Sequence, residues 1–179
     1  MPLIPEKFRT ARTPGELLRQ RRWLAGYIAK CLAGAVLVEL VVRVVPDIDP
    51  FWTMISTILV LTPESDQAMP LAITRMKANA CGSCAALACM ALALPHLAGL
   101  ALAFTVTAAL CFLWDVMDGS RAAMAASLIV MQREPGSHVW DGALHRLIAV
   151  FGGCLLGVAV TFVYHRAVDA AEKRRVPKP

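Results

Sequence analysis

Long apolar stretches fill the chain between residues 23 and 165, and only short polar segments separate them. Apolar residues make up 58% of the sequence and charged residues 17%, against about 45–50% and about 25% in an average soluble domain. In water such a chain would expose an extensive apolar surface. The composition therefore excludes a soluble enzyme and favours a protein embedded in a lipid bilayer.

Basic residues are concentrated at the two ends of the apolar region. Segment 1–22 holds six of the 18 Lys and Arg residues, and segment 166–179 holds five. Basic residues beside membrane-spanning segments mark the cytoplasmic side, so both termini are predicted to lie in the cytoplasm, at a bacterial-type inner membrane. Because these charges flank the apolar region, no nucleic-acid partner is expected. We therefore divide the chain into a basic cytoplasmic segment (1–22), a membrane domain (23–165) and a basic cytoplasmic tail (166–179).

Proline and cap residues divide the membrane domain into six predicted helices. Thr13-Pro14-Gly15-Glu16 is typical of a helix start, so the first helix is expected to begin near Pro14 and to enter the membrane at Trp23. Asp49-Pro50 predicts the start of the second helix in the same way. The apolar segments cover residues 23–45, 51–62, 73–94, 97–114, 121–131 and 143–164. The predicted fold class is all-α, a polytopic membrane protein with six transmembrane helices.

The second and fifth predicted helices are short. Segment 51–62 would extend only about 20 Å, less than the hydrocarbon core of about 30 Å. An even number of crossings agrees with two cytoplasmic termini. In this orientation segments 62–77 and 115–121 are also cytoplasmic, which places 14 of the 18 basic residues on that side.

The two halves of the chain match each other weakly at an offset of about 70 residues. Thr57-Ile-Leu-Val-Leu61 lies against Ser127-Leu-Ile-Val-Met131. With one residue inserted, Ala72, Arg75, Ala78 and Gly82 lie against Ala143, Arg146, Ala149 and Gly153. Each unit, about 23–94 and 97–164, has three helices, so the second is predicted to insert upside down relative to the first. Inverted repeats with short helices at matching positions indicate a transport site near the bilayer midplane.

Basic side chains in the predicted spans are the first candidates for a substrate path. Lys30 stands seven residues inside the first span, where a charge costs at least about 2.5–3.5 kcal/mol unless it is hydrated or paired. Arg75 and Arg146 are each expected to open a helix. Two interpretations stay open for all three residues. Long cationic side chains can extend to the membrane interface, or they can attract an anionic substrate, since guanidinium and carboxylate pair in a fork.

Aromatic and hydroxyl side chains on the short helices are the other path candidates. Phe51 and Trp52 fit an aromatic belt at the outer interface, with path lining as the alternative. Hydroxyl groups are supplied by Thr53, Ser56 and Thr57 on the second helix and by Ser127 on the fifth. Such groups either bond back to a carbonyl one turn earlier or contact a passing solute.

Small residues and the remaining polar residues indicate packing rather than chemistry. Gly153 and Gly157 form a G-x-x-x-G spacing that allows close helix approach, and Gly82 is expected to act in the same way. No histidine pair has metal-ligand spacing on one helix face, so neither a metal nor a cofactor is predicted. The motif 115–121 resembles the opening of membrane CDP-alcohol phosphotransferases, but residues 122–131 contain no acid. We therefore expect a turn here, and no enzyme.

Several of these motifs together resemble the membrane half of the fusaric acid resistance and aromatic acid exporter family. They are Phe51-Trp52, Leu59-Val60-Leu61-x-Pro63, Ala72-x-x-Arg75 followed by Gly82, and the recurrence of Ala143-x-x-Arg146 with Gly153. The resemblance covers roughly residues 23–165. Plant aluminium-activated malate transporters are distant relatives, with six helices and a dimeric pore.

The resemblance implies an inner-membrane exporter of small organic acid anions, aromatic acids included, that works as a homodimer in the lipid bilayer. Family members usually carry a large cytoplasmic helical domain, and many have two membrane halves. This chain looks like a single six-helix unit. The alternative is therefore a membrane subunit or scaffold that does not itself transport and that partners a larger efflux assembly.

Overall fold

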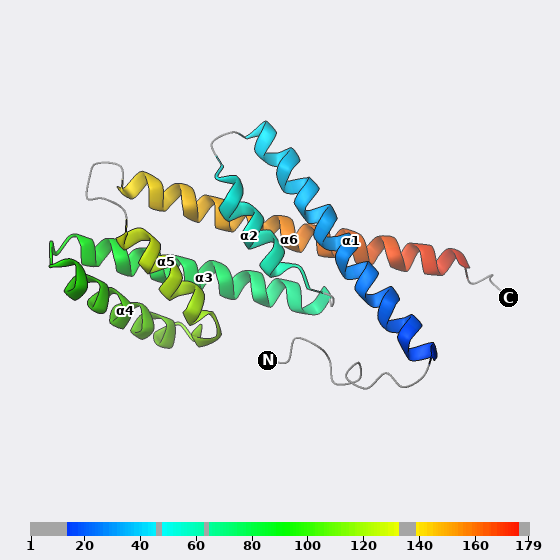
Figure 1. Cartoon of the computed structure of the whole chain (residues 1–179), viewed down its shortest axis with the longest axis horizontal. Coiled ribbons are helices and arrows are strands. Elements are labelled where there is room, and N and C mark those ends of the chain that lie inside the picture. The colour runs from blue at the N-terminus through cyan, green and yellow to red at the C-terminus, as the bar shows by residue number, and fades with distance from the viewer. Residues whose placement is uncertain (1–13, 46–47, 63–64, 133–138, 176–179) are drawn as a thin grey trace.

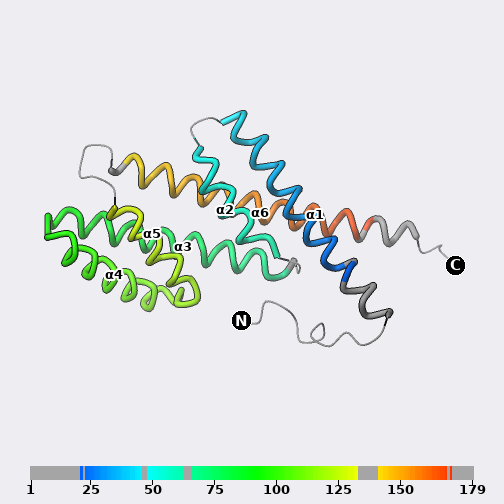
Figure 2. Tube along the Cα trace, viewed as in Figure 1, coloured from blue at the N-terminus to red at the C-terminus, as the bar shows by residue number. Residues whose placement is uncertain are grey.

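The structure is a computed structural model that describes residues 14–45, 48–62, 65–132 and 139–175. Within these residues the chain is helical and has no strand, as predicted. The helices are α1 (Pro14–Val44), α2 (Pro50–Val60), α3 (Ser65–Met90), α4 (His96–Leu113), a 3-10 turn η2 (Met117–Gly119), α5 (Ser120–Met131) and α6 (Val139–Arg175). Figures 1 and 2 show them as an elongated bundle in which α3 and α6 are the long central helices.

Local cap and turn residues explain where several helices begin. α1 starts at Pro14, as predicted. At α2 the Asp49 side chain accepts hydrogen bonds from the backbone N–H of Phe51 (2.9 Å) and of Trp52 (3.3 Å), and Pro50 occupies the first helical position. These contacts satisfy donors that a helix start leaves without intrahelical partners. α2 and α5 contain 11 and 12 residues.

Two helices begin earlier than the apolar segments indicated. α3 starts at Ser65 and contains Pro70, and α6 starts at Val139. Pro70 is the sixth residue of α3, beyond the first four N–H groups, so it removes one intrahelical hydrogen-bond donor there. Arg75 and Arg146 therefore lie well inside α3 and α6, and the prediction that each opens its helix is wrong.

Each of the two short helices packs between two of the four long helices. α3 and α6 contact each other, α2 packs on α6, and α5 packs on α3. On the outside, α1 contacts α2 and α6, whereas α4 contacts α5 and α3. Figure 1 shows α2 crossing α6 and α5 crossing α3. Each short helix thus packs against the third helix of the other half of the chain.

Glycines on α3 and α6 permit the closest of these approaches. A Cβ atom at Gly82 would collide with the backbone carbonyl of Ala123 on α5. A Cβ atom at Gly153 would collide with the backbone carbonyl of Thr53 on α2, and one at Gly157 would lie 2.9 Å from the Thr57 carbonyl oxygen. At these positions the backbone of α5 can therefore contact the backbone of α3 directly, and the backbone of α2 can contact that of α6.

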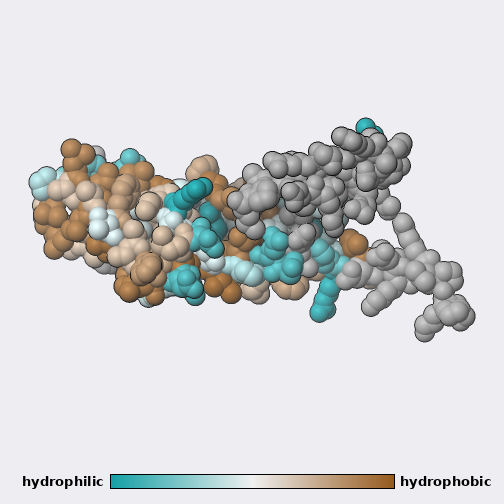
Figure 3. All heavy atoms as spheres, turned by 90° about the horizontal axis from the view of Figure 1, so that it is seen from below, coloured by the Kyte–Doolittle hydropathy of each residue, from teal (hydrophilic) through white to brown (hydrophobic). Residues whose placement is uncertain are grey.

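Three helical segments of the described chain are long and apolar enough to cross a membrane: Trp23–Val44, His96–Leu113 and Asp141–Val168. Most of their residues are not buried inside the bundle. On α1 large apolar side chains are exposed at every fourth position: Leu24, Ile28, Leu32, Val36, Leu40 and Val44. Figure 3, seen from the side of α4, shows apolar side chains over much of the described surface. An apolar exterior of this extent suits lipid rather than water.

Candidate functional site

Arg146 links three helices at the centre of the bundle. Its side chain on α6 is only 5% exposed. Nη1 donates a hydrogen bond to the Ala126 carbonyl oxygen of α5 (3.0 Å), and the guanidinium carbon lies 4.2 Å from the centroid of the Trp52 ring of α2. A desolvated cation over an indole ring gains about 2 kcal/mol. These contacts offset part of the cost of burying the charge, so Arg146 fixes the positions of α2 and α5 against α6.

Most of the candidate hydroxyl groups have nearby backbone acceptors. Thr57 Oγ1 lies 2.9 Å from the Thr53 carbonyl oxygen and 3.0 Å from the Gly153 carbonyl oxygen, and the second contact ties α2 to α6. Thr53 Oγ1 donates to the Asp49 carbonyl oxygen (2.8 Å), and Ser127 Oγ to the Met124 carbonyl oxygen (2.9 Å). These contacts follow the back-bonding pattern of hydroxyl side chains in apolar helices.

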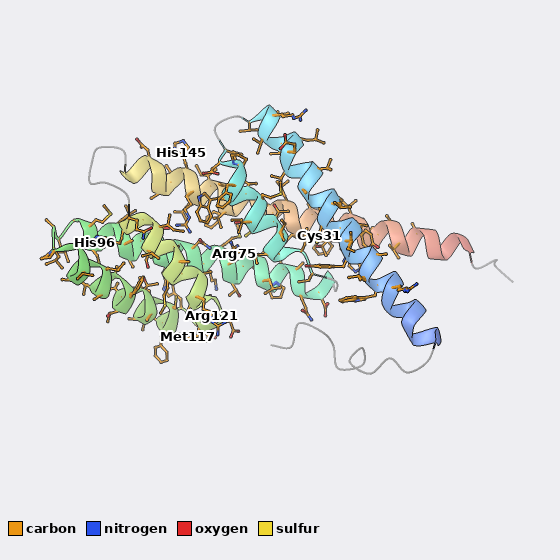
Figure 4. All side chains as sticks on the ribbon, in the orientation of Figure 1. Cys31, Arg75, His96, Met117, Arg121 and His145 are labelled. Carbon is orange, nitrogen blue, oxygen red and sulfur yellow. The ribbon has the colours of Figure 1, made fainter. Side chains whose placement is uncertain are left out.

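Ser56 and Arg75 have donors that the described protein does not satisfy. Ser56 is fully buried, and its Oγ has no hydrogen-bond partner among the described residues. The buried Nε atom of Arg75 also lacks a partner there. Figure 4 places Arg75 near the middle of the molecule. An unsatisfied buried polar group costs about 1–3 kcal/mol, and more when it is charged, so such groups call for a specific reason.

Two consecutive residues of α6, Gly153 and Cys154, lie near Ser56 and Arg75 respectively. A Cβ atom at Gly153 would lie 2.8 Å from Ser56 Cβ. The next residue, Cys154, is within electrostatic range of Arg75. Cys154 also packs with Val60 of α2 and Ala72 of α3 in one buried cluster. Ser56 and Arg75 therefore border one region, where α2 and α3 both meet α6.

Lys30 lies in a different environment from the two arginines. It is 2% exposed, its Nζ donates to the Thr62 carbonyl oxygen (3.0 Å), and Nζ lies 4.9 Å from the centroid of the Tyr164 ring. In Figure 4, Cys31, which follows Lys30 in the chain, lies beside the crossing of α1 and α6. These contacts of Lys30 connect α1 to the segment that follows α2 and to α6.

Of the two predicted aromatic path residues, only Trp52 contacts a charged candidate. Phe51 is 64% exposed, and its ring meets Trp52 edge-on with centroids 5.3 Å apart. Trp52 is half-buried and covers Arg146. Phe51 consequently faces the surroundings of the bundle.

Two contacts were missed in the sequence. Tyr164 is not among the predicted path residues, yet its ring is a partner of Lys30, and a charged group inside a span needs a partner at its own depth. Lys30 and Tyr164 both lie toward the predicted cytoplasmic ends of their spans, and this was the available signal. Asn79 is 3% exposed and donates through Nδ2 to the Arg75 carbonyl oxygen (2.9 Å). Its position one turn after Arg75 on the same helix was the available signal.

Candidate metal ligands do not gather in the part of the chain that the structure describes. There, no group of three His, Cys, Asp or Glu residues is placed to hold an ion. The buried polar and charged side chains of the described interior carry basic, hydroxyl and amide groups.

Residues 32–160, more than two thirds of the chain, match the family described as fusaric acid resistance protein-like. The matched range contains α2, α3, α4 and α5 whole and the parts of α1 and α6 that pack on them. No curated protein and no solved structure matches the chain.

Proposed function

Since the chain belongs to the fusaric acid resistance protein-like family, we propose that it is an inner-membrane transporter that moves small organic acid anions, aromatic acids among them. The family and the apolar helices support a multi-pass membrane protein with a transport or resistance role. The observation that carries the choice of an anion is the pair of arginines, Arg75 and Arg146, held inside the helices at the centre of the bundle. Cations are retained at such depth for a path or a partner.

The proposal includes two inverted three-helix units, α1–α3 and α4–α6. Support comes from the packing, because the most extensive helix contacts of one unit have counterparts when the units are exchanged. α2 on α6 corresponds to α5 on α3, and Gly153 against Thr53 corresponds to Gly82 against Ala123. These pairs also align at the offset of about 70 residues in the sequence. With six crossings, both termini would lie in the cytoplasm. The short helices α2 and α5 would then occupy matching positions in the two units.

Opposite insertion of the two units predicts opposite sides for the segments that precede the short helices. A topology reporter fused after Ile48 should report periplasm, whereas one fused after Gly119 should report cytoplasm, because the two points are equivalent in the repeat. A fusion after Asp66 serves as a second cytoplasmic point. Reporters after Ile48 and Gly119 on the same side of the membrane would contradict the inverted repeat.

The route itself is proposed to run beside α2 and α5, with positive potential along it. Neither short helix is long enough to cross a core of about 30 Å directly. In inverted units their amino-terminal ends would point inward from opposite sides and add partial positive charge near each entrance. Lys30, Arg75 and Arg146 add full charges to this potential. We further propose that two copies form a closed homodimer.

Reconstitution tests whether the protein transports at all. Purified chain in liposomes should take up labelled benzoate or malate faster than protein-free liposomes, with and without an imposed proton gradient. The uptake rate should rise because the protein would provide a positively charged passage through a lipid bilayer that carboxylate ions do not cross on their own. If folded protein gives no uptake of either anion under both conditions, the alternative of a non-transporting membrane subunit becomes the better account.

A further inference from the structure

Arg75 and Arg146 occupy equivalent positions in the two units but have different surroundings. Arg146 reaches the Ala126 carbonyl oxygen and lies under Trp52. In the first unit the residue equivalent to Ala126 is Ser56, and the residue equivalent to Arg146 is Arg75. Here the arginine makes no side-chain hydrogen bond to the described protein through its buried Nε, and the serine hydroxyl is also unsatisfied. The Nε of Arg146 likewise has no hydrogen-bond partner among the described residues, so the two units differ in the Nη1 bond of Arg146 and in the hydroxyl group of Ser56, which stands where the second unit has Ala126.

Residues about one turn from each of the two donors, Ser56 and Arg75, belong to one buried cluster with α6. The helices α2 and α3 are joined by a short connection and run back past each other, as Figure 1 shows. Val60 and Ala72 share a buried cluster near the connection. Ser56 is one turn before Val60, and Arg75 is about one turn after Ala72. α2 packs mainly on α6 and only marginally on α3, so the donors border a boundary between helices that are not tightly packed together.

A carboxylate matches this arrangement chemically. Its two oxygens accept hydrogen bonds from a guanidinium fork and from a hydroxyl group, and charge-assisted bonds of this kind are the stronger ones. A carboxylate would also neutralise the charge of the half-buried Arg75 guanidinium. We propose that Arg75 and Ser56 form a binding site for the carboxylate group of a small organic acid, whereas Arg146 acts mainly by holding α2 and α5 on α6. The site rests on the proposed transport function and names the residues that contact the anion.

Equilibrium binding to the full chain, purified in detergent, tests the site. Labelled benzoate is the probe, and neutral benzamide of the same shape controls for partition into detergent. Arg75→Gln should weaken benzoate binding about 10- to 100-fold and Ser56→Ala about 3- to 10-fold, which are the usual effects of losing a charged and a neutral hydrogen bond. The benzoate affinity of Arg75→Lys should lie between those of Arg75→Gln and the wild type, because lysine keeps the charge but lacks the guanidinium fork.

Thr107→Val supplies a matched control for the serine. Thr107 Oγ1 is likewise buried without a described hydrogen-bond partner, but it lies on α4. This variant should bind benzoate like the wild type. Melting temperatures of all variants identify any that fail to fold. If Arg75→Gln does not fold, the benzoate affinity of Ser56→Ala still tests the site.

Failure of the site and failure of transport give different results. Wild-type protein that binds benzoate no better than benzamide, or Ser56→Ala and Arg75→Gln with wild-type affinity, would overturn the site even if liposomes show benzoate uptake. Benzoate binding that depends on Arg75 and Ser56, in a protein without uptake, would support the site and overturn the transport function.

Discussion

Gly153→Ala is expected to separate α2 from α6 and to lower stability sharply. The new methyl group would collide with the Thr53 carbonyl and lie 2.8 Å from Ser56 Cβ. Backbone held in a helix cannot move aside as a flexible side chain can, and overpacking a dense interior costs about 1–3 kcal/mol or more. The hydrogen bond from Thr57 Oγ1 to the Gly153 carbonyl oxygen would lengthen as well. We expect a loss of about 3 kcal/mol, which corresponds to roughly 6–12 °C in melting temperature.

The neighbouring Gly152 provides the control for this substitution. A Cβ atom at Gly152 would meet nothing within 4 Å. Alanine is favoured over glycine inside a helix by about 0.8–1.0 kcal/mol, so Gly152→Ala should keep or slightly raise the melting temperature in detergent. Equal behaviour of Gly152→Ala and Gly153→Ala would show that α2 does not rest on α6 as described.

Local signals in the sequence were sufficient for most of the helices. Prolines and an aspartate cap lie at or near the starts of α1 and α2, and turn residues separate α4 from α5; such contacts involve only a few neighbouring residues. The resemblance to the family also followed from short motifs, and residues 32–160 match that family. The early starts of α3 and α6 were missed because hydropathy marks apolar segments, whereas these helices extend into polar residues.

The environment of each candidate residue could not be predicted in the same way. Whether Arg146 lies at an interface or under Trp52 depends on α2 packing against α6, and these elements are far apart in the chain. The partner of Lys30 depends similarly on α1 crossing α6 near Tyr164. Periodicity shows that a helix has an apolar face but does not choose its neighbour. The difference between Arg75 and Arg146 appears only once these contacts are known.

Arg75→Gln is expected to reduce organic anion flux at least tenfold. The substitution removes the charge and the fork that we propose meet the carboxylate, and a hydrogen bond to a charged group contributes about 1.5–3 kcal/mol. Glutamine retains a polar end of shorter reach, so packing should change little. Because Arg75 Nε has no described hydrogen-bond partner, its loss should leave the melting temperature near that of the wild type.

Arg121→Gln is the matched control, since it removes the same charge from an exposed position at the start of α5, labelled in Figure 4. The most direct test is the initial rate of labelled benzoate uptake by liposomes that contain equal amounts of folded wild type, Arg75→Gln or Arg121→Gln. We predict uptake by the wild type and by Arg121→Gln, and a rate near that of protein-free liposomes for Arg75→Gln. Wild-type uptake that Arg75→Gln leaves unchanged would contradict an anion route past Arg75.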